Sequence, residues 1–138
     1  MPFVRTQVHA DSSAQQRAAI VAGIHDALVE SIGMPPDELF NALSEYRDGQ
    51  FHFSRSFNGI ARSQQVVVIE ITLRRGRSDA MKRDLYARIA ANLAQHAEVA
   101  PADTFIFLHE NDYSDWSVGG GVAAMALVQQ TGGVERQA

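Results

Sequence analysis

Val66–Leu73, with the sequence VVVIEITL, is the strongest strand signal in this chain and decides its fold. The run is nearly continuous in β-branched and apolar residues, which predicts a strand buried on both faces. Arg74–Arg77 (RRGR) ends the strand, and Ser78 can cap a helix after it. That helix is predicted by apolar residues recurring at helical spacing, namely Met81, Leu85, Ile89 and Leu93.

A further strand signal follows this predicted helix. Pro101 and Asp103 are typical turn residues. Thr104–Leu108 has the sequence TFIFL, which is typical of a strand. The second half of the chain is therefore predicted as strand–helix–strand.

The first half begins in the same way. Phe3–His9 alternates between two faces with a period of two residues, which predicts a strand. Asp11, Ser12 and Ser13 supply capping groups for a helix, and Gly33 is a typical helix stop, reinforced by Pro35-Pro36. The helix itself is predicted by residues at helical spacing: Ala18, Ala19, Val21, Ala22, Ile24, His25, Leu28 and Val29.

The stretch 37–62 has no clear period. Asp37 can cap a short turn that runs through Phe40. Phe51, Phe53 and Phe57 fit either an edge strand or a loop. We expect one irregular strand in this stretch, which would complete the first strand–helix–strand unit.

Two such units predict an α+β fold, in which two β-α-β units form one mixed sheet with both helices on one face. The two units share a pattern of elements and no visible sequence identity. The strands carry more apolar surface than two helices can cover. We therefore expect the chain to form an oligomer.

The composition is that of a single globular domain, residues 1–138, with a polar tail from about residue 131. The absence of cysteine excludes disulfides, thiol nucleophiles and thiolate metal sites. A net charge of −4 provides no basic surface for nucleic acid. No apolar run approaches the ~20 residues of a membrane helix, and no signal peptide is visible. We expect a soluble cytoplasmic protein with no membrane or nucleic-acid partner.

Pro2 is the first candidate for chemistry. A small second residue allows Met1 to be removed, which would leave the secondary amine of Pro2 as the α-amino group. Such a group titrates at roughly 7.7–8.0, close enough to neutral to act as acid or base. Nearby arginines would lower its pKa and favour a base, whereas a carboxylate would raise it and favour an acid. The alternative is that Met-Pro has no functional meaning.

Arg74, Arg75 and Arg77 follow directly on the strongest strand. Arginine clusters bind planar carboxylates through paired hydrogen bonds. Strand alternation would put Arg75 and Arg77 on one side and Arg74 on the other. The alternative is a solvated basic turn that pairs with Glu70 or Asp79.

Asp37 and Glu38 are the candidate carboxylates. They follow a Pro-Pro turn, where an acidic residue often only caps a short helix. The functional alternative is a carboxylate that orients a water molecule or stabilises a protonated amine.

The remaining candidates point to no metal site. No two of the five histidines share a metal-ligand spacing, and we interpret them as surface or core residues. Gly119–Gly121 lacks the Gly-Lys-Ser/Thr ending of a phosphate loop and is typical of a tight bend. Trp116, just before it, fits either the core or the wall of a pocket.

Four groups of residues, taken together, resemble the motifs of a known protein family. They are Met1-Pro2; Ile32-Gly33-Met34-Pro35; Arg75-Gly76-Arg77-Ser78 with Lys82 and Leu85-Tyr86; and Asn111 with Asp115-Trp116-Ser117-Val118-Gly119. Over roughly residues 2–126 the chain resembles the tautomerase superfamily, in particular the branch of malonate semialdehyde decarboxylase and its tautomerase-like relatives. The resemblance implies two β-α-β units around a mixed sheet, a homotrimer, and no cofactor or metal.

The resemblance also implies roles for single residues. Pro2 corresponds to the family's catalytic amino-terminal proline. Arg75 and Arg77, with Arg74 as the alternative to one of them, correspond to the pair that binds the substrate carboxylate. Trp116 corresponds to an aromatic wall of the pocket.

Two positions depart from the decarboxylase pattern. Glu38 stands where the decarboxylase has an aspartate, with Asp37 one residue away. Val118 stands where it has a phenylalanine, and Met125 is a further expected substrate contact.

Three functions remain open on this basis. In a tautomerase, neutral Pro2 would move a proton next to the ketone of a small 2-oxo or 2-hydroxyalkenoic acid. In a lyase of the decarboxylase or hydratase type, protonated Pro2 would polarise a 3-oxo or unsaturated short-chain acid, with Glu38 or Asp37 activating water. The third is a trimeric binding module without catalysis. The positive charge of the arginines favours the neutral amine and the tautomerase.

Overall fold

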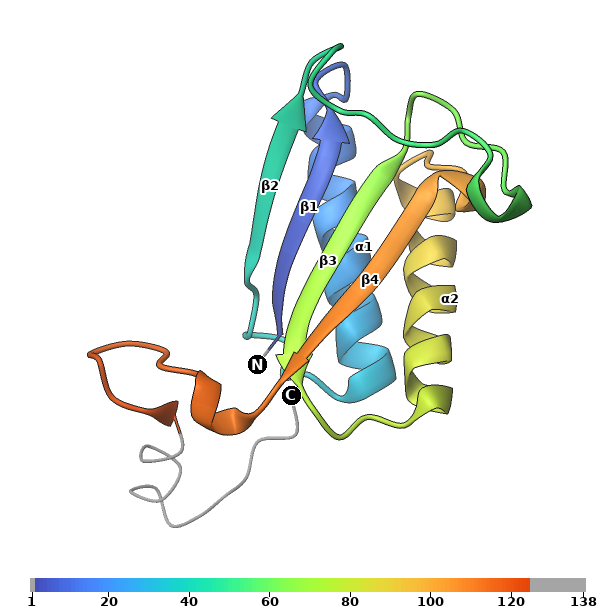
Figure 1. The fold of residues 1–138 in the computed structure, drawn as a ribbon. Helices are drawn as coiled ribbons and strands as arrows, with labels where there is room; N and C mark the ends of the chain where they lie inside the picture. Colours follow the sequence, from blue (N-terminus) through green and yellow to red (C-terminus); the bar gives the residue numbers. More distant parts are fainter. Residues whose placement is uncertain (1, 125–138) are drawn as a thin grey trace.

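The computed structural model describes residues 2–124 (Figure 1). Four strands and two helices follow one another in the order β1 (Phe3–His9), α1 (Ala14–Ile32), β2 (Asn41–Tyr46), β3 (Val67–Arg74), α2 (Asp79–His96) and β4 (Thr104–Asn111). Short 3-10 turns lie at Phe57–Gly59, Pro101–Asp103 and Tyr113–Asp115. The predicted contact Met125 and the predicted polar tail lie outside the described residues.

The strands form one mixed sheet in the order β2-β1-β3-β4. β1 runs parallel to β2 and antiparallel to β3, and β3 runs parallel to β4. Both helices lie on one face of the sheet (Figure 1). This arrangement confirms the predicted α+β fold of two β-α-β units. No helix among the described residues is long and apolar enough to cross a membrane.

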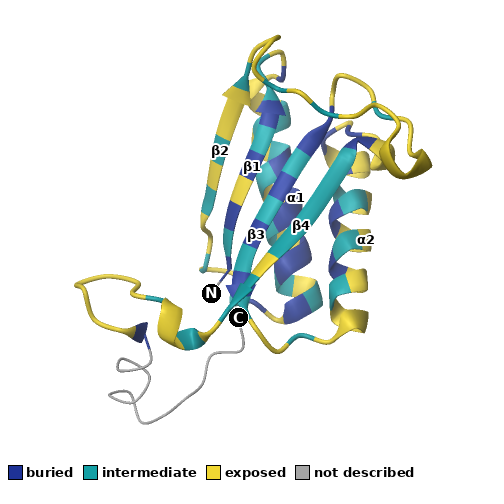
Figure 2. Cartoon of the chain, in the orientation of Figure 1, coloured by how far each residue is buried: buried dark blue, intermediate teal, exposed yellow. Residues whose placement is uncertain are grey.

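The core fills the space between the sheet and the helices (Figure 2). Along β3 buried and half-buried residues alternate strictly in the single chain, so the helices bury only one of the two faces predicted to be buried in Val66–Leu73. The reason is that both helices pack on the same face. Ile69 and Ile71 point into the core, whereas Glu70 and Thr72 face away from the helices and are half-buried.

The first predicted strand and both predicted helices are confirmed. α1 begins after Ser13, whose hydroxyl oxygen accepts a hydrogen bond from the backbone N–H of Gln16, and it ends at Gly33 with a left-handed φ of 70°. α2 begins after Ser78, whose hydroxyl accepts from the N–H of Met81. The two caps are 65 positions apart (78 − 13), which places the two units in correspondence.

Two predicted strands are present with bounds that the sequence did not give. The irregular strand expected in 37–62 is β2 at Asn41–Tyr46, and Phe51 and Phe53 lie beyond it in the loop. β2 is an edge strand with exposed residues among half-buried ones, so its sequence lacks a strong hydrophobic period. β4 also extends three residues past the predicted Leu108, to Asn111.

No described helix covers the second face of the sheet (Figure 1). Aromatic side chains of β4 pack edge to face along it, with 6.2 Å between the ring centroids of Phe105 and Phe107 and 5.2 Å between those of Phe107 and His109. The face also carries a polar pair, because the amide of Gln7 donates a hydrogen bond to Glu70. It is thus an aromatic surface with a polar centre.

Candidate active site

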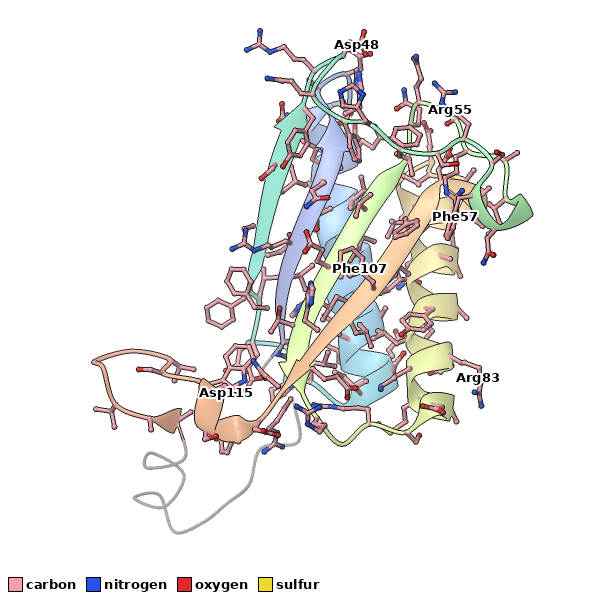
Figure 3. The ribbon with its side chains drawn as sticks, viewed as in Figure 1. Asp48, Arg55, Phe57, Arg83, Phe107 and Asp115 are labelled. Atoms are coloured by element: carbon pink, nitrogen blue, oxygen red, sulfur yellow. The ribbon has the colours of Figure 1, made fainter. Side chains whose placement is uncertain are left out.

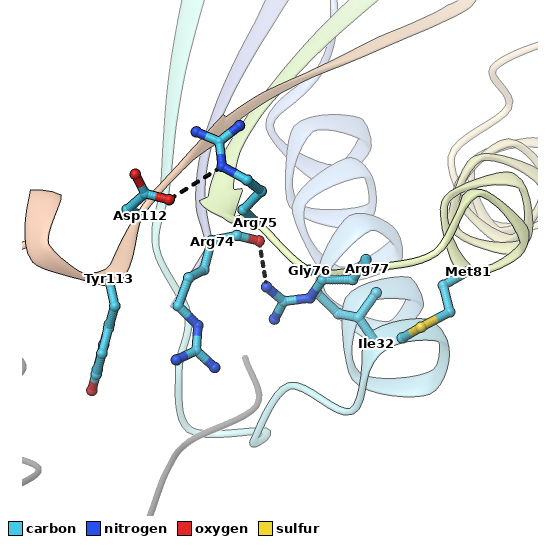
Figure 4. A pocket seen from close by; sticks show the side chains of 8 residues that line it. All are labelled: Ile32, Arg74, Arg75, Gly76, Arg77, Met81, Asp112 and Tyr113. Atoms are coloured by element: carbon cyan, nitrogen blue, oxygen red, sulfur yellow. Dashed lines mark hydrogen bonds and ion pairs between the residues drawn. The ribbon is translucent and has the colours of Figure 1, made fainter.

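A cleft of about 440 Å³ opens where β3 and β4 end (Figure 4). Its walls come from the β3–α2 loop, the segment after β4 and the last turn of α1. The lining residues are Ile32, Arg74, Arg75, Gly76, Arg77, Met81, Asp112 and Tyr113. Met81, one of the residues whose spacing predicted α2, is 37% exposed and lines this cleft.

The arginine cluster (Arg74, Arg75 and Arg77) lines this single cleft. Figure 4 shows the side chains of Arg74 and Arg75 extending in opposite directions, as strand alternation predicts, and all three residues nevertheless line the cleft. Strand alternation holds only as far as the strand does, and β3 ends at Arg74. Gly76, with a φ of 124°, then bends the backbone.

Each arginine of the cluster contacts a partner close by. Nε of Arg75 lies 3.1 Å from Oδ1 of Asp112. The Arg74 guanidinium lies over the ring of Tyr113, 4.7 Å from its centroid. Nη1 of Arg77 donates a 2.7 Å hydrogen bond to the backbone oxygen of Arg74.

Asp112 and Tyr113 are site residues that the sequence reasoning missed. The available signal was their position directly after the last strand. The parallel pairing of β3 with β4 places Arg74 beside Asn111, and the chain ends of adjacent parallel strands meet at one edge of a sheet.

The electrostatics of the cleft are dominated by positive charge. Burial, and then repulsion from Arg74, hold the pKa of Arg77 below its ordinary value, while Glu110 opposes the shift. Nζ of Lys82 lies 2.9 Å from Oε1 of Glu110, and this hydrogen bond raises the pKa of Lys82. The region therefore favours anions.

Pro2 is buried at the beginning of β1. β1 and β3 are antiparallel, with Phe3 opposite Thr72. This register places Pro2 beside Leu73, one residue before the arginine cluster begins. The amino-terminal end of β1 and the arginine cleft thus lie at the same end of the sheet.

Glu38 lines a cavity together with Pro2, whereas Asp37 is not among its lining residues. Pro2 and Glu38 line one small cavity of about 10 Å³, together with residues of α1 and β2. The Oε2 atom of Glu38 is buried there, and its backbone N–H donates a 3.0 Å hydrogen bond to the oxygen of Pro35. Asp37 is exposed outside this cavity. Of the two candidate carboxylates, Glu38 is the one that shares a cavity with Pro2.

Trp116 and Val118 lie beyond the cleft lining. Nε1 of Trp116 donates a 2.8 Å hydrogen bond to Oδ1 of Asn111, and its backbone oxygen accepts from Ala124. Val118 is 53% exposed. All three residues of Gly119–Gly121 have positive φ, which confirms the predicted bend.

Within residues 2–124, no group of three or more histidine or carboxylate side chains is placed to hold a metal ion. The cleft instead presents guanidinium groups and a tyrosine ring. Such an arrangement can bind a small carboxylate by charge and paired hydrogen bonds.

Comparisons with known proteins agree with this geometry. A family model described as tautomerase enzyme matches residues 38–119, and a second with the same description matches residues 2–54. The probable tautomerase YusQ of Bacillus subtilis (strain 168) is 30% identical over 125 residues, covering 91% of this chain and 98% of that protein.

Solved structures share the fold over nearly the whole length. FG41 malonate semialdehyde decarboxylase inhibited by 3-bromopropiolate has a TM-score of 0.86 at 33% identity, covering 92% of this chain and 96% of that one. A symmetric trimer of wild-type fused 4-OT has a TM-score of 0.75 at 21% identity, covering 91% and 98%. Together with the two β-α-β units, the matches to the family models and to YusQ show that this chain belongs to the tautomerase enzyme family.

Proposed function

We propose that this enzyme catalyses keto-enol tautomerisation of small 2-oxo acids such as phenylpyruvate, or of 2-hydroxyalkenoates, with the amine of Pro2 as its proton carrier. The observation that carries the proposal is the β1–β3 register, which puts Pro2 at the arginine end of β3. The proposal requires removal of Met1, because only then is the amine of Pro2 free.

The reaction divides between the two groups. Neutral Pro2 removes the proton next to the ketone and returns it elsewhere on the same substrate. The arginine cluster, above all Arg75 and Arg77, binds the carboxylate and stabilises the negative charge of the enolate. The positive charge of the cluster also disfavours a protonated amine, which keeps Pro2 in the basic form at neutral pH.

A lyase of the malonate semialdehyde decarboxylase or hydratase type is the second candidate. It is favoured by Glu38, a half-buried residue with a buried Oε2 atom that lines the same cavity as Pro2. A carboxylate there would raise the pKa of the amine and keep it protonated. The 33% identity to FG41 malonate semialdehyde decarboxylase supports the same candidate.

We also propose that the enzyme is a cytoplasmic homotrimer. The aromatic sheet face, with Phe105, Phe107 and His109, lacks a covering helix among the described elements and suits contact with another copy. The fused 4-OT described as a trimer has the same fold. We expect sedimentation equilibrium to give three times the mass of the chain.

Trp116 and Val118 follow β4 at the cleft end of the sheet and are proposed walls of the pocket, with Met125.

The decisive experiment begins with the intact mass of the purified protein. We expect a mass without Met1 and a single adduct on Pro2 after reaction with 3-bromopropiolate. A protein that retains Met1, or adducts scattered over lysines, would remove the proline mechanism and leave a binding module.

Variants then separate the two candidate reactions. Pro2→Ala and Arg77→Ala should abolish phenylpyruvate turnover, whereas Arg83→Ala, an exposed arginine of α2 outside the cleft, should leave it unchanged (Figure 3). Loss of water addition to unsaturated acids alone in Glu38→Gln would favour the lyase. Equal unfolding transitions of all variants would exclude misfolding as the cause.

A further inference from the structure

A second cleft, of about 360 Å³, lies at the opposite end of the sheet from the arginine cleft. It is formed where β1 and β2 end and by the loop that leads to β3. The lining residues are His9, Arg47, Asp48, Gly49, Phe51, His52, Phe53, Arg55 and Gln64. Figure 3 shows Asp48 and Arg55 at this end and Asp115 at the other.

The two clefts occupy corresponding places in the two β-α-β units. The β1–β2 pair closes with a 2.8 Å hydrogen bond from the N–H of Ala10 to the oxygen of Tyr46, and the β3–β4 pair with a 2.7 Å bond from Arg75 to Asn111. Both members of the second bond are shifted by 65 positions from those of the first (75 − 10 and 111 − 46). The second cleft is thus the counterpart of the arginine cleft in the first unit.

Cationic and aromatic groups line this second cleft together. Phe51 and Phe53 pack edge to face, with 5.3 Å between ring centroids, and the guanidinium of Arg55 lies 5.6 Å from the centroid of Phe53. Neither Arg47 nor Arg55 forms an ion pair with another residue in the range 2–124. Two positive charges therefore border an aromatic surface.

The one carboxylate among the lining residues already has a partner. Nδ1 of His9 accepts a hydrogen bond from the N–H of Asp11 at 3.1 Å, so Nε2 carries the proton in the neutral ring. Nε2 then donates to Oδ1 of Asp48 at 2.8 Å. Among the lining residues the two arginines outnumber Asp48, which is directed to His9; outside the lining, Oδ2 of Asp11 lies 3.3 Å from the other ring nitrogen of His9.

This second cleft has no counterpart of a free proline amine. The same shift of 65 aligns Pro2 with Val67, which is 3% exposed and lies inside the chain with its nitrogen in a peptide bond. An anion held at the second cleft would meet no amine that could exchange a proton with it.

We propose that the second cleft is a non-catalytic binding site for small aromatic carboxylates. Arg47 and Arg55 bind the carboxylate through charge-assisted hydrogen bonds, and the ring of the ligand packs on Phe51 and Phe53. The site is distinct from the proposed active site and does not depend on its chemistry.

The test is a titration of the ¹⁵N-labelled full-length protein with benzoate, followed by amide chemical shifts. We expect shifts around Phe51 and Phe53. The double variant Arg47→Ala/Arg55→Ala should raise the dissociation constant for these shifts roughly tenfold or more, because it removes the charge-assisted hydrogen bonds. Arg77→Ala, at the other cleft, should leave them unchanged.

Two further ligands test the contributions of the charge and of the aromatic ring separately. Benzamide has the same shape without the charge and should give no shifts at this cleft. Inorganic phosphate has the charge without the ring and should bind more weakly than benzoate. Benzoate shifts confined to the β3–β4 end, shifts that survive the double variant, or equal shifts with benzamide or phosphate would each overturn the proposal. An unchanged far-ultraviolet spectrum checks that the double variant is folded.

Discussion

Asp112 is expected to compete with the substrate for Arg75. In the structure its Oδ1 atom lies 3.1 Å from Nε of Arg75. A guanidinium uses Nε and an adjacent Nη to bind a carboxylate side-on, so Asp112 takes part of the edge that a ligand would use. Asp112→Asn removes the charge and keeps the shape of the side chain. It should therefore tighten the binding of small carboxylates.

The magnitude follows from the exposure of the pair. The side chains of Arg75 and Asp112 are 61% and 65% exposed, and such ion pairs contribute about 0.2–1 kcal/mol. If a ligand no longer has to displace this partner, its affinity rises by a factor of about 1.4 to 5. The gain should shrink with added salt, because exposed charges are screened.

The assay is a titration of the protein with pyruvate, followed by the chemical shifts of the backbone amides of Arg75 and Gly76. These shifts report binding and do not depend on turnover. Asp79→Asn is the matched control, since it removes one exposed negative charge at the start of α2 without an ion pair to Arg75. An equal gain in affinity in both variants would show that the effect comes from the change in net charge alone. Weaker binding in Asp112→Asn would refute the reasoning and show that Asp112 positions Arg75 for the ligand.

Three further predictions concern stability. Asp103→Ala should lower the free energy of unfolding in urea by about 2–3 kcal/mol, because this buried carboxylate accepts hydrogen bonds from the N–H and hydroxyl of Ser63 at 2.8 and 2.6 Å; an unchanged midpoint would contradict it. Gly23→Ala should destabilise by about 1–3 kcal/mol, since its new methyl group would lie 3.0 Å from a side chain of α2; thermal melting checks this. Glu110→Gln should destabilise the protein at neutral pH, because it weakens the hydrogen bond with Glu110 that raises the pKa of Lys82. This bond is lost as Lys82 deprotonates, so the difference in unfolding free energy between variant and parent should shrink as the pH rises above the ordinary lysine pKa of 10.5. Unfolding at pH 7 and pH 11 would test the sign.

Local sequence determined most of the fold. The period of two in Phe3–His9, the nearly continuous apolar run Val66–Leu73, and the caps Ser13, Gly33 and Ser78 predicted two strands and both helices close to their observed bounds. These signals are readable because each depends on residues a few positions apart. β2 was only loosely placed, because an edge strand with half-exposed residues needs no strong hydrophobic pattern.

The sequence by itself therefore determined the fold class, the family resemblance, and Pro2 and the arginines as the candidate chemistry. Only the tertiary structure put all three arginines into one cleft, added Asp112 to them, and placed Glu38 but not Asp37 in a cavity with Pro2. The physical reason is distance along the chain. Arg75 and Asp112 are 37 residues apart, and they meet because β3 and β4 pair in one register and end at the same edge of the sheet. No local pattern encodes that register.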